Sequence, residues 1–235
     1  MIMKKLLLII MAASMFLSTS VSAANFNDIN GHWAETVINR LADSKVVSGV
    51  TATEFSPESS VTRAQYLKMV MNAVGIAEIA CEKDMCLDAY ASDWYCGYLN
   101  SALNKGLIPE DMIENYKAEI IAESSTDADG QNANVIYSGK FNGNSPINRE
   151  EMSFITMSMY QYILNAKTMQ SLTVSSDISF TDKDLISVWA HNGVAMASAN
   201  GLITGMDDGS FKPKDTATRA QAATIIGRVL DKLEK

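Results

Sequence analysis

The chain has 235 residues, of which 47% are apolar, 20% charged and 8% aromatic, a composition typical of a folded globular protein. This composition excludes a collagen-like repeat and a disordered tail. The net charge of −8 argues against a nucleic-acid binder, because phosphate contacts require clustered Lys and Arg. After residue 24, no apolar run approaches the roughly 18 residues that a transmembrane span needs.

The N-terminal segment has the features of a secretory signal peptide, which we assign to residues 1–23. Lys4 and Lys5 form a charged start, residues 6–17 are mostly apolar, and Val21-Ser22-Ala23 offers small residues for cleavage. A retained membrane anchor is the alternative, but the apolar stretch is short for a span. Without residues 1–24 the net charge becomes −10, and we expect a secreted protein.

Three cysteines, Cys81, Cys86 and Cys96, lie close together in the sequence. In an exported protein this favours one disulfide, although the spacing does not say which pair forms it. Free thiols are an alternative. A metal site is disfavoured, because three cysteines without a nearby His make a poor ligand set, and His32 and His191 are distant in the sequence.

An internal repeat organises the rest of the chain. After Trp33, a Gly, a Phe, a Pro and an Arg follow at spacings of 16, 22, 24 and 30 residues, and the same residue types follow Trp189 at the same spacings. Phe26-x-Asp28 and Phe180-x-Asp182 precede the two tryptophans. The repeated residues are Gly49, Phe55, Pro57 and Arg63 in one copy and Gly205, Phe211, Pro213 and Arg219 in the other.

A third, degenerate copy lies between these two. It contains Asp88, Trp94, Phe141 and Arg149, with an insertion at 111–140. Glu110 stands where the other copies have the glycine. We therefore divide the chain into a first segment (24–76), a second segment (86–165) and a third segment (176–232), each predicted to be one repeat.

Each segment is predicted to form a helix, a loop and a second helix. Apolar residues follow each Trp at helical spacing, as Val37, Ile38 and Leu41 do. The second helix is predicted to begin with a capping box, in which a Thr or Asn cap is followed three residues later by Glu or Gln. These boxes are Thr62-Arg63-Ala64-Gln65, Asn148-Arg149-Glu150-Glu151 and Thr218-Arg219-Ala220-Gln221. In the insertion, Val135-Ile136-Tyr137 predicts a short strand.

Phe-x-Asp, the Trp, the Gly, Phe-x-Pro and the Thr-Arg-Ala-Gln cap together resemble the S-layer homology (SLH) module, whose hallmark is Thr-Arg-Ala-Glu. The resemblance covers residues 26 to about 231. It implies a mainly α-helical fold in which three repeats pack as an intrachain pseudo-trimer, with grooves between repeats. It also implies non-covalent binding to a secondary cell-wall polysaccharide, often pyruvylated, at the bacterial cell surface or S-layer.

The repeated residues are the candidate ligand-binding residues. Arg63, Arg149 and Arg219 are the most informative. A cation at a helix start is unfavourable by about 0.3–1 kcal/mol, and its repetition at three helix starts indicates a compensating role for the arginines. The free N–H groups of the helix and a planar guanidinium together suit a carboxylate, and the resemblance implies a pyruvyl ketal. The alternative is a structural Arg that bridges to the Asp of a neighbouring Phe-x-Asp. The other candidates are Trp33, Trp94, Trp189, Asp28, Asp88, Asp182, Gly49 and Gly205.

Two interpretations stay open for these other candidates. The tryptophans form either the core or the wall of a sugar-binding groove. The aspartates either orient the arginines or accept hydrogen bonds from sugar hydroxyl groups, or else they form turns and caps. Gly49 and Gly205 permit either a close backbone approach or a positive φ. Because the second segment lacks this glycine and the Phe-x-Pro, we expect an altered groove there and the smallest contribution to binding from Arg149.

The sequence contains no common catalytic motif, such as Gly-x-Ser-x-Gly, His-Glu-x-x-His or a phosphate-binding Gly-rich loop. We therefore expect a binding protein rather than an enzyme, without a metal or cofactor. The leading function is association with a cell-wall glycan. The alternative is a surface adaptor that uses the insertion at 111–140 to hold another surface protein.

Overall fold

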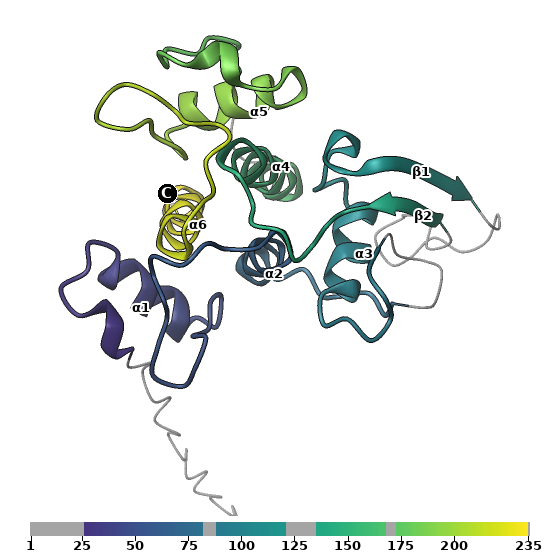
Figure 1. The fold of residues 1–235 in the computed structure, drawn as a ribbon, viewed down its shortest axis with the longest axis horizontal. Coiled ribbons are helices and arrows are strands. Elements are labelled where there is room, and N and C mark those ends of the chain that lie inside the picture. Colours follow the sequence, from purple (N-terminus) through teal and green to yellow (C-terminus); the bar gives the residue numbers. More distant parts are fainter. Residues whose placement is uncertain (1–25, 82–87, 121–134, 168–172, 235) are drawn as a thin grey trace, which may run out of the picture.

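The computed structural model describes residues 26–81, 88–120, 135–167 and 173–234. The predicted signal peptide, Cys86 and residues 121–134 of the insertion lie outside these ranges. Within them the chain forms six α-helices and one two-stranded sheet (Figure 1), so the prediction of a mainly α-helical protein is confirmed.

The α-helices form three successive pairs, as the helix-loop-helix pattern predicts. The pairs are α1 (Glu35–Asp43) with α2 (Arg63–Val74), α3 (Cys96–Asn104) with α4 (Arg149–Lys167), and α5 (Val188–Ala199) with α6 (Arg219–Leu233). Three short 3-10 helices, η1–η3, span Asn27–Ile29, Glu110–Met112 and Lys183–Leu185. Trp33 and Trp94 lie just before α1 and α3 rather than inside them, whereas Trp189 lies in the first turn of α5.

The second helix of each pair lies in the middle of the molecule (Figure 1), where α2, α4 and α6 contact one another. The first helices lie outside, and each packs on the central helix of a different pair: α1 on α6, α3 on α2 and α5 on α4. Each outer helix is therefore packed against a central helix that belongs to a different segment of the sequence. The apolar core is continuous through this arrangement, and it includes Met152, Met157 and Met159 of α4.

The three central helices begin with the predicted caps. Thr62 Oγ1 accepts from Gln65 N at 3.2 Å while Gln65 Oε1 accepts from Thr62 N at 3.1 Å, and Thr218 and Gln221 repeat this box. Asn148 and Glu151 form the equivalent box: Asn148 Oδ1 accepts from Glu151 N at 2.9 Å, and Glu151 Oε2 accepts from Asn148 N at 3.0 Å. All three capping boxes are thus confirmed, and they fix where each central helix begins.

The residues just before the central helices pair with one another. Backbone bridges join Ser60 to Thr218, Thr62 to Pro146, and Asn148 to Thr216. Each of the three segments therefore pairs with both of the others, and the pairing closes as a ring beside the starts of α2, α4 and α6.

The insertion of the second segment forms a hairpin on the outside of the molecule (Figure 1). Strand β1 (Glu114–Ile120) pairs antiparallel with β2 (Val135–Lys140), with Lys117 opposite Ser138 and an irregularity toward the Glu114–Lys140 pair. The predicted strand at residues 135–137 is therefore confirmed. Nearby, a disulfide joins Cys81 to Cys96, the first residue of α3, with their Cα atoms 5.6 Å apart.

Each of the three outer helices is followed by a residue with a positive φ, and one of these residues is not a glycine. Gly106 and Gly201 follow α3 and α5 with φ of 66° and 65°, but the residue that follows α1 in the same way is Lys45, with φ of 59°. A non-glycine residue in this conformation costs about 1 kcal/mol. Lys45→Gly should therefore raise the free energy of unfolding by up to about 1 kcal/mol in a urea titration. Lys45→Ala is the control, because it removes the same side chain and keeps the strained φ; an equal gain from both variants would contradict the explanation.

Candidate functional site

One phenylalanine in each segment is held by an aspartate from the same segment. Asp28 accepts from Phe55 N at 2.9 Å and from Ser56 N at 2.6 Å. Asp88 and Asp182 accept in the same way from the N–H groups of Phe141 and Asn142, and of Phe211 and Lys212, at 2.7–2.8 Å. The residue after each Phe has φ of 54–57°, so the carboxylates stabilise strained turns. The aspartates thus form turns. The alternative interpretation, a direct bridge from an arginine to one of these aspartates, does not occur among the ion pairs of the described residues.

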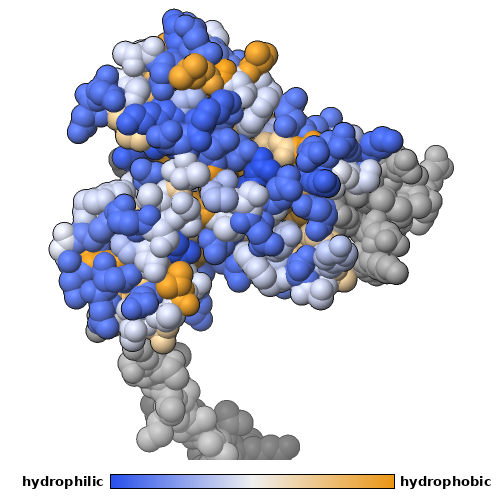
Figure 2. All heavy atoms as spheres, viewed as in Figure 1, coloured by the Kyte–Doolittle hydropathy of each residue, from blue (hydrophilic) through white to orange (hydrophobic). Residues whose placement is uncertain are grey.

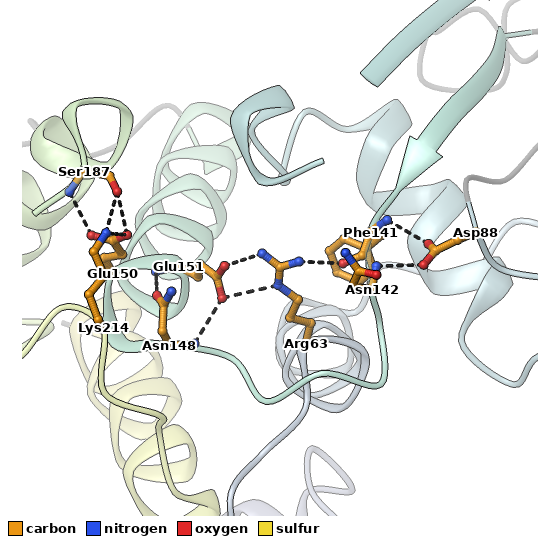
Figure 3. A network of polar contacts seen from close by, with 9 residues as sticks. All are labelled: Arg63, Asp88, Phe141, Asn142, Asn148, Glu150, Glu151, Ser187 and Lys214. Atoms are coloured by element: carbon orange, nitrogen blue, oxygen red, sulfur yellow. Dashed lines mark hydrogen bonds and ion pairs between the residues drawn. The ribbon is translucent and has the colours of Figure 1, made fainter. Parts of the chain in front are cut away.

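The carbonyl group of each of these phenylalanines is held by an arginine from another segment. Arg149 Nε donates to Phe211 O at 2.7 Å, and Arg219 Nε donates to Phe55 O at 2.8 Å. Arg63 Nη1 donates to Phe141 O at 2.7 Å (Figure 3). Each guanidinium also lies over the ring of the same Phe, 4.4–5.7 Å from its centroid. The repeated Asp, Phe and Arg therefore form one contact series, in which the Asp and Phe come from one segment and the Arg comes from another.

The first N–H groups of the central helices are not free, which corrects one part of the expected anion site. Arg63 N donates to Ser145 O at 3.0 Å, Arg149 N to Asp215 O at 3.0 Å, and Arg219 N to Ser59 O at 2.9 Å. The next residue of each helix donates to another backbone carbonyl of the same neighbouring segment, and the capping boxes occupy the third N–H. Only the side chains at these helix starts are available for a ligand.

Arg149 and Arg219 each donate a second hydrogen bond, from Nη2, to the loop that contains the repeated glycine (Gly205 or Gly49). Arg149 Nη2 donates to Thr204 O at 3.1 Å, and Arg219 Nη2 donates to Ser48 O at 2.8 Å. Both residues are only 7% exposed, and burial lowers the pKa of each guanidinium, although the carboxyl group of Asp28 opposes this for Arg219. An arginine remains charged after such a change, because its ordinary pKa lies far above physiological pH.

Each of these two arginines lines a groove. The Arg149 groove encloses about 210 Å³ and the Arg219 groove about 240 Å³. Equivalent residues line both: Trp33, Thr204, Gly205, Gln221, Thr224 and Arg228 in the Arg149 groove, and Trp94, Ser48, Gly49, Gln65, Lys68 and Asn72 in the Arg219 groove. Each groove thus combines side chains from all three segments.

The glycines act through close approach rather than through a positive φ. A Cβ atom on Gly49 would lie 2.4 Å from Thr51 O and 2.5 Å from the ring of Phe26. On Gly205 it would lie 2.8 Å from the ring of Phe180. Both loops must fold tightly over the Phe of Phe-x-Asp to place a carbonyl group against the arginine.

The tryptophans divide between the two interpretations. Trp33 is 63% exposed and Trp94 49% exposed, so both lie at the groove walls and neither is a core residue. Trp189 is half-buried, and its ring centroid lies 5.8 Å from that of Phe154. Trp189 is therefore a packing residue.

Arg63 differs from the other two arginines. It forms an ion pair with Glu151 (Figure 3). Its Nε and Nη2 both donate to this carboxylate, whereas Nη2 of Arg149 and Arg219 donates to a backbone carbonyl of the glycine loop. The altered site of the second segment therefore involves Arg63, and not Arg149 as the sequence suggested. The reason is that each arginine contacts the Phe of a different segment: Arg63 contacts Phe141 of the second segment, and Arg149 contacts Phe211 of the third.

The Asp28 contacts predict an acid-sensitive stability. Burial alone would raise the pKa of Asp28, but the N–H groups of Phe55 and Ser56 outweigh it and hold the pKa below its ordinary value of 3.8. The carboxylate thus stabilises the fold above about pH 4, and this contribution is lost as the pH falls through the lowered value. In urea titrations at several pH values, Asp28→Asn should be less stable than wild type near neutrality and converge with it in acid. A difference independent of pH would contradict this.

Within the described residues, helix-loop-helix segments pack around three central helices and form grooves that Trp and Arg line, which is the architecture of a helical repeat protein. The family model of the S-layer homology domain matches residues 25–67 and 179–223, so the chain carries this domain at two positions. The second segment falls outside both matches. Within the described residues, no helix is long and apolar enough to cross a membrane.

Several relatives cover nearly the whole chain. It is 35% identical to an exoglucanase, XynX, from Acetivibrio thermocellus and 34% identical to an amylopullulanase from Thermoanaerobacterium thermosulfurigenes, over 89% and 88% of its length. It is 23% identical, over 91% of its length, to a surface-layer 125 kDa protein from Lysinibacillus sphaericus. The chain spans only 16%, 10% and 16% of the lengths of these three relatives, in the same order. The family and these relatives identify a secreted cell-surface protein.

Proposed function

We propose that the three helix pairs are three S-layer homology repeats packed as an intrachain pseudo-trimer, and that the protein binds a cell-wall polysaccharide non-covalently. The family match and the surface-layer relative support a role in cell-surface anchoring. The single observation that carries the proposal is the pair of equivalent grooves at Arg149 and Arg219, because Trp, Arg, Gly and Gln recur at equivalent positions in both.

The chemistry of both grooves suits an acidic sugar. An exposed Trp offers a flat apolar face to a pyranose ring, and Gln221 or Gln65 offers amide groups to its hydroxyl groups. Among the described residues, the hydrogen bonds of Arg149 and Arg219 use Nε and Nη2, and Nη1 is the group that we propose for a carboxylate such as that of a pyruvyl ketal. The face seen in Figure 2 is mostly hydrophilic with small separate apolar patches, which supports a polar ligand.

Each groove also holds a second cation. Lys68 Nζ lies 5.4 Å from the ring centroids of both Trp94 and Tyr98, and Arg228 lines the Arg149 groove. Among the described residues, neither has a carboxylate within ion-pair distance. These cations stand at different helical positions, because Lys68 aligns with Thr224 and Arg228 aligns with Asn72. The two grooves therefore favour the same ligand class with different affinities.

The experiment that tests the proposal is co-sedimentation of the purified protein with cell-wall sacculi before and after extraction of the secondary polymer. Loss of binding upon extraction is expected. If binding survives extraction, the glycan is not the ligand. Binding that instead requires a protein of the surface layer and the β1–β2 hairpin would favour the adaptor function.

Raising the salt concentration to physiological strength should not weaken this binding. A protein with a charge near −10 and a carboxylate-bearing polymer repel each other at a distance, and physiological salt screens this repulsion beyond about 8 Å. The buried arginine contacts are screened much less, so the affinity should stay constant or rise slightly from low to physiological salt. Removing the carboxylate of the ligand should cost more than any salt change. A steep loss of co-sedimentation with salt would point to a diffuse charged patch instead.

A further inference from the structure

The position where a third groove would complete the set is occupied by side chains of the protein. We infer that Glu151 and Phe154 close this position, so that the chain has two open ligand sites and one latent site at Arg63. The inference rests on the proposed function, because it concerns the number of its sites.

Glu151 carries the first part of the argument. It occupies the helical position of Gln65 and Gln221, and all three side chains cap their own helix in the same way. At this position only Glu151 has a carboxylate, and that carboxylate faces both Nε and Nη2 of Arg63. Because Arg63 Nη1 donates to Phe141 O, all three nitrogens of this guanidinium contact the protein and its charge is already paired. The side chains of Arg63 and Glu151 are 12% and 10% exposed, so a ligand would have to displace a largely buried partner.

Phe154 carries the second part. It stands at the position of Lys68 and Thr224, which line the two open grooves. The Phe154 ring packs on Trp189, and Gly193 of α5 permits this approach, because a Cβ atom there would lie 2.8 Å from Phe154 Cδ2. Trp189 is half-buried as a result, whereas Trp33 and Trp94 are 63% and 49% exposed. The aromatic face that would meet a sugar ring is therefore covered by the protein.

An internal carboxylate competes well with a dissolved one. It is always present at a high effective concentration, so a ligand must bind Arg63 more tightly than Glu151 does before it can enter. Two substitutions would make the latent site resemble the Arg149 groove. Glu151→Gln keeps the helix cap, as Gln221 does, and removes the charge; Phe154→Thr places the residue found at position 224.

Calorimetric titration with a pyruvyl-ketal hexosamine glycoside tests the inference through the number of sites. Wild type should bind two molecules, and E151Q/F154T should bind three. Adding R63A to this double variant should restore two. Helical circular dichroism and thermal melting establish that each variant is folded.

The possible outcomes are separable. Three molecules bound by wild type would overturn the inference without any variant, as would two bound by a folded double variant. If the double variant does not fold, R63A/E151Q decides, because it should still bind two molecules; a loss of one would show that Arg63 already serves an open site. No binding by wild type would contradict the proposed function instead.

Discussion

Replacing Arg149 and Arg219 together should abolish measurable binding to cell-wall sacculi. Each arginine supplies a charge-assisted contact to the ligand, worth about 1.5–3 kcal/mol, so each single substitution by Ala should weaken binding by about 10- to 100-fold. Co-sedimentation isotherms give these affinities, and thermal melting establishes that the variants remain folded.

Lysine variants separate charge from geometry at the same positions. Arg149→Lys and Arg219→Lys keep the positive charge but lose the planar group that donates to Phe211 O or Phe55 O while the residue lines the groove. They should bind nearly as poorly as the alanine variants. Normal binding by the lysine variants would show that a positive charge is sufficient and that the described geometry does not matter.

The three tryptophans should respond in opposite ways to substitution by alanine. Trp33 and Trp94 are largely exposed, so Trp33→Ala and Trp94→Ala should weaken wall binding by about tenfold and change the stability by less than about 0.5 kcal/mol. Trp189 packs on Phe154, so Trp189→Ala should lower the free energy of unfolding by about 3 kcal/mol and leave the affinity of the folded protein unchanged.

Urea titrations and co-sedimentation on the same three variants check this prediction. Trp189→Ala serves as the control for the other two, since it removes the same side chain from the same place in the repeat. A loss of affinity in folded Trp189→Ala would contradict the packing role, and a large loss of stability in Trp33→Ala would contradict the groove role.

Local features of this fold were predictable from the sequence. The capping boxes at Thr62, Asn148 and Thr218 are settled by contacts between residues three apart, so a single sequence is sufficient to predict them. The helix pairs follow from apolar spacing in the same way. The strand at residues 135–137 was recognisable from its β-branched and aromatic residues.

Contacts between segments were not predictable in this way. The sequence repeat shows which residues are equivalent, but it does not show that Arg63 contacts Phe141 rather than its own Phe55. The altered site was therefore assigned to the wrong arginine. Trp189 was grouped with Trp33 and Trp94 for the same reason, because its exposure depends on Phe154, which lies in another segment outside the repeated motif.

The contacts of Arg219 also have a consequence for how the protein folds. This residue donates to Phe55 O and Ser48 O, which lie 164 and 171 positions earlier in the chain, and Ser60 pairs with Thr218 nearby. Such high contact order slows folding, because the chain must close a long loop before these contacts stabilise it. The Gly49 loop can be completed only when α6 has arrived. A chain exported N-terminus first would therefore complete its Arg219 groove only after α6 has emerged, long after the Gly49 loop itself has been exported.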